Sequence, residues 1–469
     1  MGILGFLDSR KDELFWIADQ VWDASELGFR EHKSASIQAD YLASNGFVVE
    51  RQAGGIPTAI VAQWGTGGPR VGFLGEYDAL AGVSQEVSCE RKPREAGGPG
   101  HGCGHNLLGT AAVGAALALK EALSRAGIPG TVRYYGCPAE ELLAGKVYMA
   151  RQGLFDDLDV AITWHPGSMN TVRLGSGNAM NSVKFRFRGK TAHAAGDPHN
   201  GRSALDAVEL MNVGANYLRE HVINDARIHY VITEGGGQPN VVPADAEVWY
   251  FVRAPHRNQV DEIYERLVDV AEGASLMTGT SFEVNFLTGC YEVLLNEVLA
   301  DVMWKSLQKV GPPQFDDSDL EFARALRETF DRASLLAMAK SPDFVEFNLK
   351  DQVLHRDLMP PRGKGRSGGG STDVGDVSWI VPTVQMSAAT VPLGCPGHSW
   401  QNCASSGHSI GKKGMMVAAK TMALCALELV KNPEIIEKAK AEFLEKTKDS
   451  PYKCPFPKDR QFPLNEFFE

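Results

Sequence analysis

The sequence lacks the features expected of a membrane, secreted or lipid-anchored protein. No apolar run reaches the roughly 18 residues of a membrane-spanning helix, and the first residues, MGILGFLDSRKDEL, become acidic too early for a signal peptide. Phe6 stands where a myristoylation signal requires Ser or Thr. The eight cysteines are scattered over 469 residues, without the dense spacing of a secreted disulfide scaffold. We therefore expect a cytoplasmic protein.

The chain also has no excess of positive charge. Its formal net charge of −11 argues against nucleic acid or an anionic membrane as the main partner. Hydrophobic residues make up 43% of the chain and charged residues 22%, which is typical of a soluble globular protein. The length exceeds what a single ordinary core accommodates, so two domains are expected.

Strands and helices alternate over the first 178 residues. Helical spacing of apolar residues predicts one helix over 11–45, and small residues over 107–127 predict another that packs closely on a sheet. Short apolar segments predict the strands TAIVAQWG, RVGFLGEYDAL, TVRYYGC and DVAITWHP. This alternation predicts an α/β fold with a largely parallel central sheet flanked by helices.

The pattern changes after residue 178. Alternating strands and two amphipathic helices over 179–291 fit a small α+β layer inserted into a larger domain formed by 1–178 and 292–469. From about residue 292 the chain is predicted to be helical and irregular. The glycines and prolines of 340–370 indicate either a mobile loop near the site or a disordered linker.

Side chains with metal-ligand chemistry follow the predicted strands. They are Asp78, Cys103, His105, Glu140, Glu141 and His165. The carboxyl ends of parallel strands share one edge of an open α/β sheet, where ligands bind. Cys103 and His105 are two residues apart, so both side chains project to the same side of an extended turn. The sequence therefore predicts one polar cluster at this edge.

Thiolate, imidazole and carboxylate groups are ligands of zinc and related divalent metals. There are more candidates than one four-coordinate ion requires, which indicates two ions. A hydrolase of this kind also needs a base that is not a ligand. The doublet Glu140–Glu141 supplies it, because one carboxylate can bind metal while its neighbour takes the proton of the attacking water.

Each of these signals has an ordinary structural explanation. A single cysteine such as Cys137 is usually a packing residue, two glutamates at a helix start offset the helix dipole, and a lone histidine after a strand is often structural. The combination favours the metal interpretation. A Cys103 nucleophile with His105 as its base is less favourable, because side chains two apart on one turn rarely reach the required geometry.

Five motifs occur in a characteristic order: GHGCGH, GCPAEE, TWHP, GKTAHAA and PGHSWQ. Together they resemble the di-metal aminoacylase–carboxypeptidase family of metallopeptidases, and within it the amidohydrolase branch. The resemblance extends over LGEYDALAG, GRSALDAVELM, STDVGDVSW and PYKCPFPK, and so covers essentially the whole chain. One departure is Asn106, which stands where the branch often has an aspartate.

The resemblance implies roles for individual residues. The implied metal ligands are Cys103, His105, Glu141, His165 and His398, and Glu140 is the implied general base. The inserted domain is implied to be a lid and dimerisation layer whose His193 stabilises the tetrahedral oxyanion in the partner's active site. Asn240 and Arg253 match positions that hold the substrate carboxylate. Without the resemblance, His193 is a surface turn histidine and Arg253 a paired strand residue.

The resemblance implies a metal-dependent amidohydrolase that cleaves N-acyl or N-aroyl amino acids, with p-aminobenzoyl-glutamate-like molecules as the preferred substrates. Two divalent ions are expected. The resemblance favours manganese, and the softness of a thiolate ligand makes zinc the second choice. A homodimer is expected, and the alternative is a heterodimer with a homologous subunit. The alternative functions are a dipeptidase for β-alanyl or lysyl dipeptides and a non-catalytic subunit of a heteromeric hydrolase.

Overall fold

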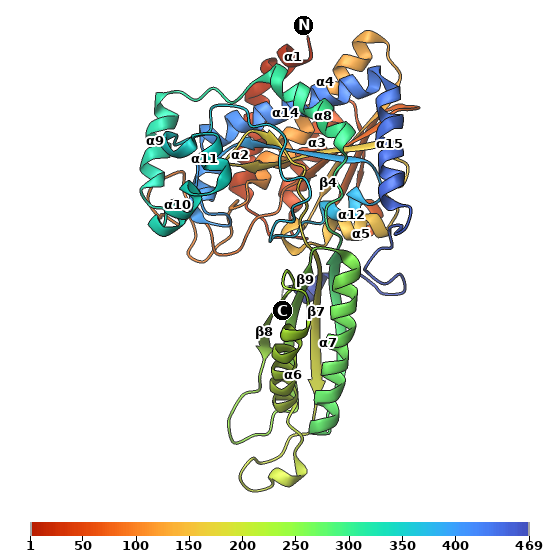
Figure 1. The fold of residues 1–469 in the computed structure, drawn as a ribbon, viewed down its shortest axis with the longest axis vertical. Coiled ribbons are helices and arrows are strands. Elements are labelled where there is room, and N and C mark those ends of the chain that lie inside the picture. The colour runs from red at the N-terminus through yellow and green to blue at the C-terminus, as the bar shows by residue number, and fades with distance from the viewer. Residues whose placement is uncertain (1, 468–469) are drawn as a thin grey trace. The chain divides into compact units, whose positions relative to one another are not determined.

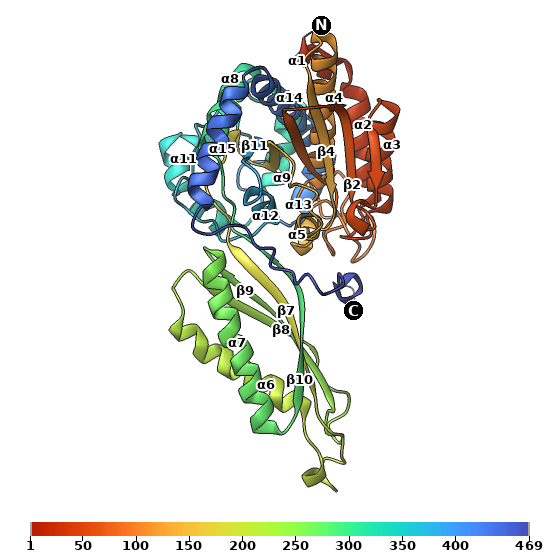
Figure 2. The same cartoon turned by 90° about the vertical axis from the view of Figure 1, so that its right-hand side faces the viewer.

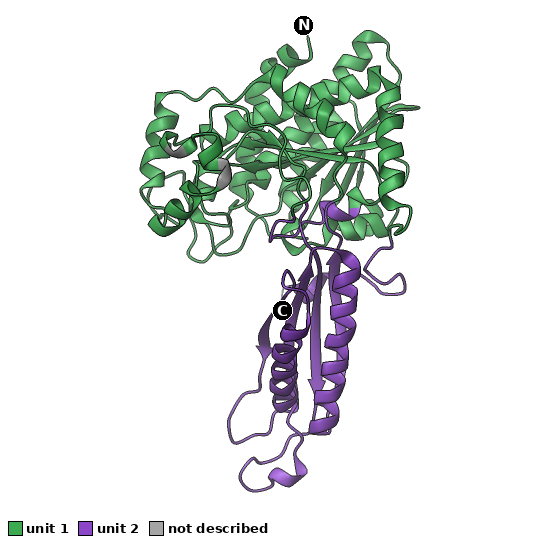
Figure 3. Cartoon of the chain, in the orientation of Figure 1, with its two compact units in different colours: residues 1–175, 294–366, 377–452 green, residues 176–293, 367–376, 453–469 purple. Residues whose placement is uncertain are grey.

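The computed structural model describes residues 2–467 and divides into two compact units (Figure 3). Unit 1 consists of Met1–Gly175, Leu294–Arg366 and Val377–Tyr452. Unit 2 consists of Ser176–Val293, Ser367–Asp376 and Lys453–Glu469. The second unit is therefore an insertion to which two later segments are added.

Unit 1 is built on a seven-stranded sheet, counted over the described residues, in the order β1-β2-β4-β3-β5-β11-β6. Its strands are β1 (Val48–Arg51), β2 (Ile60–Thr66), β3 (Arg70–Glu76), β4 (Gly130–Cys137), β5 (Val160–Gly167), β6 (Thr171–Val172) and β11 (Thr383–Ala389). The four central strands β4, β3, β5 and β11 run parallel, in a register that pairs Val71 with both Val132 and Val160. Strands β1, β2 and β6 pair antiparallel outside them. The carboxyl ends of the four central strands thus share one edge.

Helices surround this sheet (Figure 1). Those before unit 2 are α1 (Ile3–Ser9), α2 (Lys11–Ala24), α3 (His32–Ser44), α4 (His105–Ala126) and α5 (Gly145–Arg151). Those after it are α8 (Glu297–Val310), α9 (Asp317–Arg327), α10 (Arg332–Ala339), α11 (Pro342–Glu346), α13 (Trp400–Gly407), α14 (Ser409–Lys431) and α15 (Pro433–Thr447). The short helix α12 (Val374–Ser378) contains the chain boundary between the units, at Asp376 and Val377. Helix α4 packs on β3, β4 and β5 and against α14.

Small residues let α4 lie close to the sheet. A Cβ atom added at Gly109 would collide with the carbonyl oxygen of Glu76 at the end of β3. By length and composition, helix α4 is also long and apolar enough to cross a membrane, although no such segment was predicted from the sequence. However, 78% of its most apolar window is buried inside the protein, as in the core helix of a globular domain.

Residues 11–45 form two helices, so the prediction of one helix was wrong. Helix α2 ends at Ala24. The next residue, Ser25, has a left-handed φ of 43°, and Phe29 has a φ of 59°. These angles turn the chain before α3 begins. The turn has a function in the fold, because it places the buried carboxylate of Glu31 beside the Glu140–Glu141 segment.

The sequence also failed to predict β11. All seven residues of TVQMSAA are buried, and the strand pairs parallel with β5 and antiparallel with β6. Thr383, Gln385 and Ser387 alternate with apolar residues, as in a strand with one solvated face, yet both faces of β11 are buried. The segment is short, and the stretch after residue 292 was predicted to be helical and irregular. The segment 340–370, predicted as a mobile loop or linker, contains α11 and the 3-10 helix Leu349–Asp351.

Unit 2 has a four-stranded antiparallel sheet in the order β10-β7-β9-β8. Its strands are β7 (Ala179–Arg188), β8 (Arg227–Glu234), β9 (Asp245–Ala254) and β10 (Ser281–Cys290), and its helices are α6 (Ala204–Leu218) and α7 (Arg257–Thr278). The two helices lie side by side on the sheet (Figures 1 and 2). In the C-terminal segment, the carbonyl oxygen of Glu466 accepts a 2.8 Å hydrogen bond from the buried Nζ of Lys184. The sequence had assigned this segment to the larger domain.

The predicted fold class is confirmed. A catalytic-type α/β unit has a mostly parallel central sheet flanked by helices, and an inserted α+β unit has two helices on an antiparallel sheet.

Candidate metal centre

Six of the nine predicted site residues gather at the carboxyl ends of the parallel strands in unit 1. Glu140 and Glu141 form a 3-10 helix directly after β4, and His165 lies near the end of β5. His398 follows β11, while Cys103 and His105 lie at the start of α4. The strand topology thus brings together residues that are far apart in the sequence. Their positions after predicted strands had indicated this for every residue except His398.

A buried carboxylate orients His105. The Nδ1 atom of His105 lies 2.8 Å from Oδ1 of Asp78, and the other oxygen of Asp78 accepts a 2.8 Å hydrogen bond from the Glu141 backbone N–H. The Nε2 atom of His105 then points to the carboxylates, 3.3 Å from Glu76 and 3.7 Å from Glu140. Asp78 therefore fixes both the histidine ring and the backbone of the Glu140–Glu141 turn.

The backbone orients His165 in the same way. Its Nδ1 atom lies 2.7 Å from the carbonyl oxygen of Pro166, which holds the ring proton on Nδ1. Its Nε2 atom lies 3.5 Å from Sγ of Cys103. Nε2 of His165 is therefore available as a ligand beside the thiol.

The acidic doublet is held by a strained turn. Ala139 and Leu143, on either side of it, have φ values of 52° and 55°, which non-glycine residues adopt at a cost of about 1–3 kcal/mol. The backbone N–H of Ala139 donates a 2.7 Å hydrogen bond to Glu31. The Glu140 and Glu141 side chains are 9% and 10% exposed, so both carboxylates face a nearly closed space.

His398 approaches Glu141 from the segment after β11. Its Nε2 atom lies 3.5 Å from Oε2 of Glu141, and its side chain is 60% exposed. Its φ of 51° is left-handed. Strain of this kind is concentrated at functional sites, where the surroundings hold an unfavourable backbone in place.

Ligand-type atoms lie within 4.8 Å of one another in three groups: Cys103, His105 and His165; Cys103, Glu141 and His398; Glu76, His105 and Glu140. The buried atoms Nε2 of His105 and Oε1 of Glu141 have no hydrogen-bond partner among residues 2–467. An unsatisfied buried imidazole nitrogen beside an unsatisfied carboxylate oxygen is costly unless a cation sits between them. The donor set and these two atoms fit a divalent metal.

The electrostatics of the cluster agree with a cation site. Burial raises the pKa of the Cys103 thiol to about 12 and that of Glu141 to about 7, so both anions need a nearby positive charge. Burial also lowers the pKa of His165 well below its usual range, which favours the neutral, ligand-competent imidazole. Burial alone would lower the pKa of His105. The neighbouring Cys103 and Asp78 outweigh it and raise this pKa well above the usual range.

Sequence reasoning did not identify the ion pair that lies beneath the cluster. Nζ of Lys146, on α5, lies 2.7 Å from Oε1 of Glu76, and the two side chains are 0% and 2% exposed. Glu76 lies in a strand predicted from the sequence but was not among the candidate ligands. The burial of Lys146 could not be predicted from the sequence, since a lysine in an ordinary helical pattern is expected to have a solvated side chain.

Replacing Lys146 by methionine should lower the free energy of unfolding by about 3–5 kcal/mol, because the Glu76 carboxylate would stay buried without its cation. Denaturant unfolding followed by circular dichroism measures this. The double variant Lys146→Met/Glu76→Gln removes both charges and should regain most of the loss. A loss below about 1 kcal/mol for the single variant would contradict the buried-pair account.

The other three predicted site residues belong to unit 2. The backbone of Ala194, next to His193, donates a 3.0 Å hydrogen bond to the carbonyl oxygen of Asn240, so these two segments are neighbours. Nδ1 of the exposed His193 accepts hydrogen bonds from Ala195 and Gly196, which leaves the ring proton on Nε2. Arg253, in β9, donates to the hydroxyl of Ser371 at 2.8 Å and is half-buried.

Asn106 has a structural position on α4. Its Nδ2 atom donates to the carbonyl oxygens of Ala18 and Ser406 at 3.3 and 3.1 Å. The side chain is fully buried between α2 and the end of α13. A neutral amide at this position links helices that surround the cluster.

Comparison with known sequences gives relatives for the whole chain. Residues 176–276 match a family model described as a peptidase dimerisation domain. The chain is 44% identical over 457 residues to the B subunit of p-aminobenzoyl-glutamate hydrolase from Escherichia coli, covering 94% of each chain. It is 28% identical to mouse Xaa-Arg dipeptidase, covering 93% of this chain and 90% of that one. It is 30% identical to the A subunit of the same E. coli hydrolase, over 49% of this chain and 55% of that one.

Solved structures share the fold. An aminobenzoyl-glutamate utilization protein from Klebsiella pneumoniae superposes with a TM-score of 0.64 at 18% identity, covering 91% of this chain and 98% of that one. The YXEP protein of Bacillus subtilis, described as a dinuclear metal-binding peptidase of the M20 family, superposes with a TM-score of 0.58 at 16% identity. It covers 90% of this chain and 99% of that one.

Proposed function

Because the chain belongs to the M20 family of metal-dependent amide hydrolases, we propose that it releases glutamate from p-aminobenzoyl-glutamate or a closely similar N-aroyl glutamate. Membership of this family confirms two predictions: the family resemblance drawn from the motifs, and amide hydrolysis as the class of reaction. The observation that carries the proposal is the cluster around Cys103 and His105, with Glu140 beside it. The choice of substrate rests on the 44% identity to the E. coli hydrolase.

We propose that two divalent ions occupy the cluster, with manganese favoured and zinc second. Cys103, His105 and His165 would hold one ion, and Cys103, Glu141 and His398 the other, because these two groups share the thiol. When bound, the ions polarise the scissile carbonyl and make the attacking water more acidic.

In this proposal Glu140 is the general base. It accepts a proton from the attacking water as the C–O bond forms, and it returns the proton to the amine nitrogen as the C–N bond breaks. Asp78 keeps the Nε2 atom of His105 directed at the cluster. The carbonyl oxygen of Pro166 does the same for His165. With both rings fixed, little reorganisation is needed during the reaction.

The proposed roles of the unit 2 residues follow from their hydrogen-bonding capacity. His193 carries its proton on Nε2 and is exposed, which suits a donor to the oxyanion of a partner chain's substrate. Arg253 uses one nitrogen on Ser371 and keeps other donors for a carboxylate. Asn240 is an exposed neighbour of the His193 segment. We propose that Arg253 and Asn240 bind the glutamate carboxylate.

We propose a homodimer formed through unit 2. Within the described residues, strand β8 is the edge of its sheet and pairs only with β9. Tyr230, Val231 and Ile232 on this strand are 36%, 55% and 41% exposed, although an isolated protein usually protects such an edge. A heterodimer with a homologous subunit is the alternative, as is a chain without its own activity. Turnover by the purified chain alone distinguishes a self-sufficient enzyme from a dependent subunit.

A dipeptidase is the second candidate, favoured by the similarity to Xaa-Arg dipeptidase over most of the chain. The two candidates differ in the group on the carbonyl side of the scissile bond. Relative kcat/KM values for p-aminobenzoyl-glutamate and for β-alanyl or lysyl dipeptides decide between them.

Elemental analysis of protein purified without chelator or affinity nickel tests the proposal as a whole. We expect about two transition-metal ions per chain and hydrolysis of p-aminobenzoyl-glutamate that chelator abolishes and manganese restores. An absence of bound metal, with no activity after manganese or zinc is added, would refute the di-metal site. If two ions were bound but only dipeptides were hydrolysed, the di-metal site would be supported and p-aminobenzoyl-glutamate would be ruled out as the substrate.

A further inference from the structure

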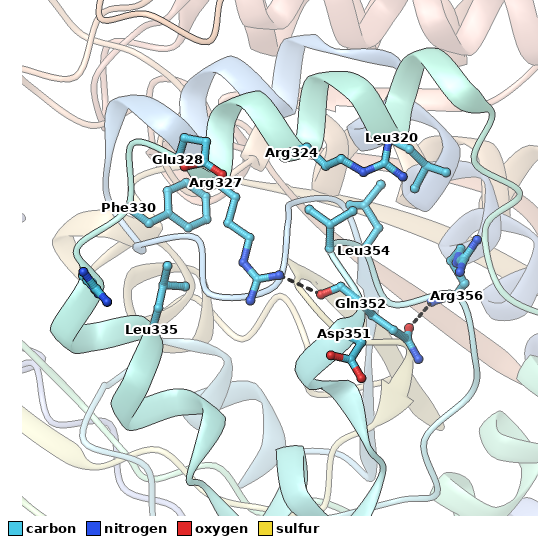
Figure 4. A pocket seen from close by; sticks show the side chains of 12 residues that line it. Leu320, Arg324, Arg327, Glu328, Phe330, Leu335, Asp351, Gln352, Leu354 and Arg356 are labelled. Carbon is cyan, nitrogen blue, oxygen red and sulfur yellow. Dashed lines mark hydrogen bonds between the residues drawn. The ribbon is translucent and has the colours of Figure 1, made fainter.

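A second cavity in unit 1 has the character of an anion-binding site. It has a volume of about 610 Å³ and is walled by the end of α9, the start of α10 and residues 351–356 (Figure 4). Sites for small organic molecules typically occupy about 300–1,000 Å³. None of its lining residues belongs to the metal centre described above.

Positive charge dominates the wall of this cavity. Its charged side chains are Arg324, Arg327, Arg332, Arg356, Glu328 and Asp351. Within the described residues, none of the four guanidinium groups has a carboxylate within 4.0 Å. Among these four, and counted over the described part of the chain, only Arg327 makes a side-chain hydrogen bond, of 2.8 Å, to the carbonyl oxygen of Gln352. Unpaired arginines in one cavity are unexpected in a chain with a net charge of −11.

Helix-end electrostatics do not explain why four arginines line one cavity. Arg324 and Arg327 lie in the last turn of α9, where cations offset the helix dipole. Arg332, however, is the first residue of α10, where a cation is unfavourable, and Arg356 lies in a segment without regular structure. Three separate elements therefore bring guanidinium groups to one cavity.

Most of the remaining lining is apolar, and Gln352 is the polar exception. Leu320, Leu335 and Leu354 contribute aliphatic surface, and Figure 4 shows these side chains around the arginines. A guanidinium group is a planar donor that matches the oxygens of phosphate or carboxylate in a two-point contact. The lining therefore fits a small molecule with an apolar body and a doubly charged anionic end.

We propose that this cavity is a binding site for small organic phosphate monoesters, separate from the metal centre. The four arginines exceed the two acidic residues by two charges, which matches a phosphate dianion. A phosphate monoester presents three oxygens to guanidinium groups, whereas a single carboxylate presents two. The leucines contact the organic part.

Isothermal titration of the metal-loaded full chain tests this site with two matched probes, phenyl phosphate and phthalate. Both are aromatic dianions at pH 8, and they differ in the anionic group. We expect phenyl phosphate to bind with a Kd below about 1 mM, more tightly than phthalate, and more weakly as salt is added. The double variant Arg324→Ala/Arg356→Ala should weaken binding at least about tenfold, because neither side chain makes a structural hydrogen bond.

Arg91→Ala, at an exposed arginine outside the cavity, is the matched control and should bind phenyl phosphate as the unchanged chain does. The double variant Arg324→Lys/Arg356→Lys keeps the charge and should retain partial binding. The proposal is wrong if phenyl phosphate does not bind, if both double variants bind it like the unchanged chain, or if phthalate binds more tightly.

Discussion

Replacing Glu140 by glutamine should lower kcat for amide hydrolysis by about 100- to 10,000-fold while the metal content stays the same. Glutamine preserves the size of the side chain but cannot accept the proton of the attacking water. The Glu140 carboxylate lies 3.7 Å from Nε2 of His105 and belongs to neither of the two groups proposed to hold the ions. Steady-state kinetics with elemental analysis on the same sample measures both quantities.

Glu90→Gln, at an exposed residue outside the site, provides the control and should leave kcat unchanged. Two results would contradict the assignment. Turnover close to that of the unchanged chain would show that Glu140 is not the base. Loss of metal together with activity would show that it is a ligand.

Replacing Cys103 by alanine should remove metal and activity together. Its thiol belongs to both proposed ligand groups, so its loss weakens both sites at once. Loss of an outer-sphere partner typically costs 10- to 100-fold in metal affinity or activity, and loss of a shared ligand should exceed about 100-fold. We expect at least one ion fewer per chain.

Cys425→Ala is the matched control, because Cys425 is also a buried cysteine but lies in α14, outside every metal-type group found among the described residues. It should keep the metal and turnover of the unchanged chain. If Cys103→Ala retained two ions, Cys103 would be a packing residue and the proposed ligand set would need revision.

The sequence predicted the site best where a candidate ligand comes directly after a predicted strand. Cys103, His105, Glu140, Glu141 and His165 could be expected to meet because parallel strands end at a common edge. His398 could not be found in this way. It follows β11, a strand that the sequence analysis did not recognise, and only the PGHSWQ motif drew attention to it.

Residues that support the cluster were harder to predict than those that form it. Lys146 is buried in an ion pair with Glu76, and Glu31 acts from a turn that the helical pattern of residues 11–45 concealed. Both are tertiary effects. Hydrophobic periodicity reports which face of an element is buried, not which charged group it meets there.

The position of β11 in the sheet also has a consequence for synthesis of the chain. Strands β5 and β6 are close in sequence but not adjacent in the sheet, because β11 lies between them. About 200 residues separate β5 from β11, which a ribosome needs roughly 10–40 s to add at about 5–20 residues per second. During that interval the edge of β5 that pairs with β11 has no partner, although the inserted segment Ser176–Val293 of unit 2 has been made. The nascent chain is therefore most exposed to mispairing there, and overproduced protein should aggregate through that edge.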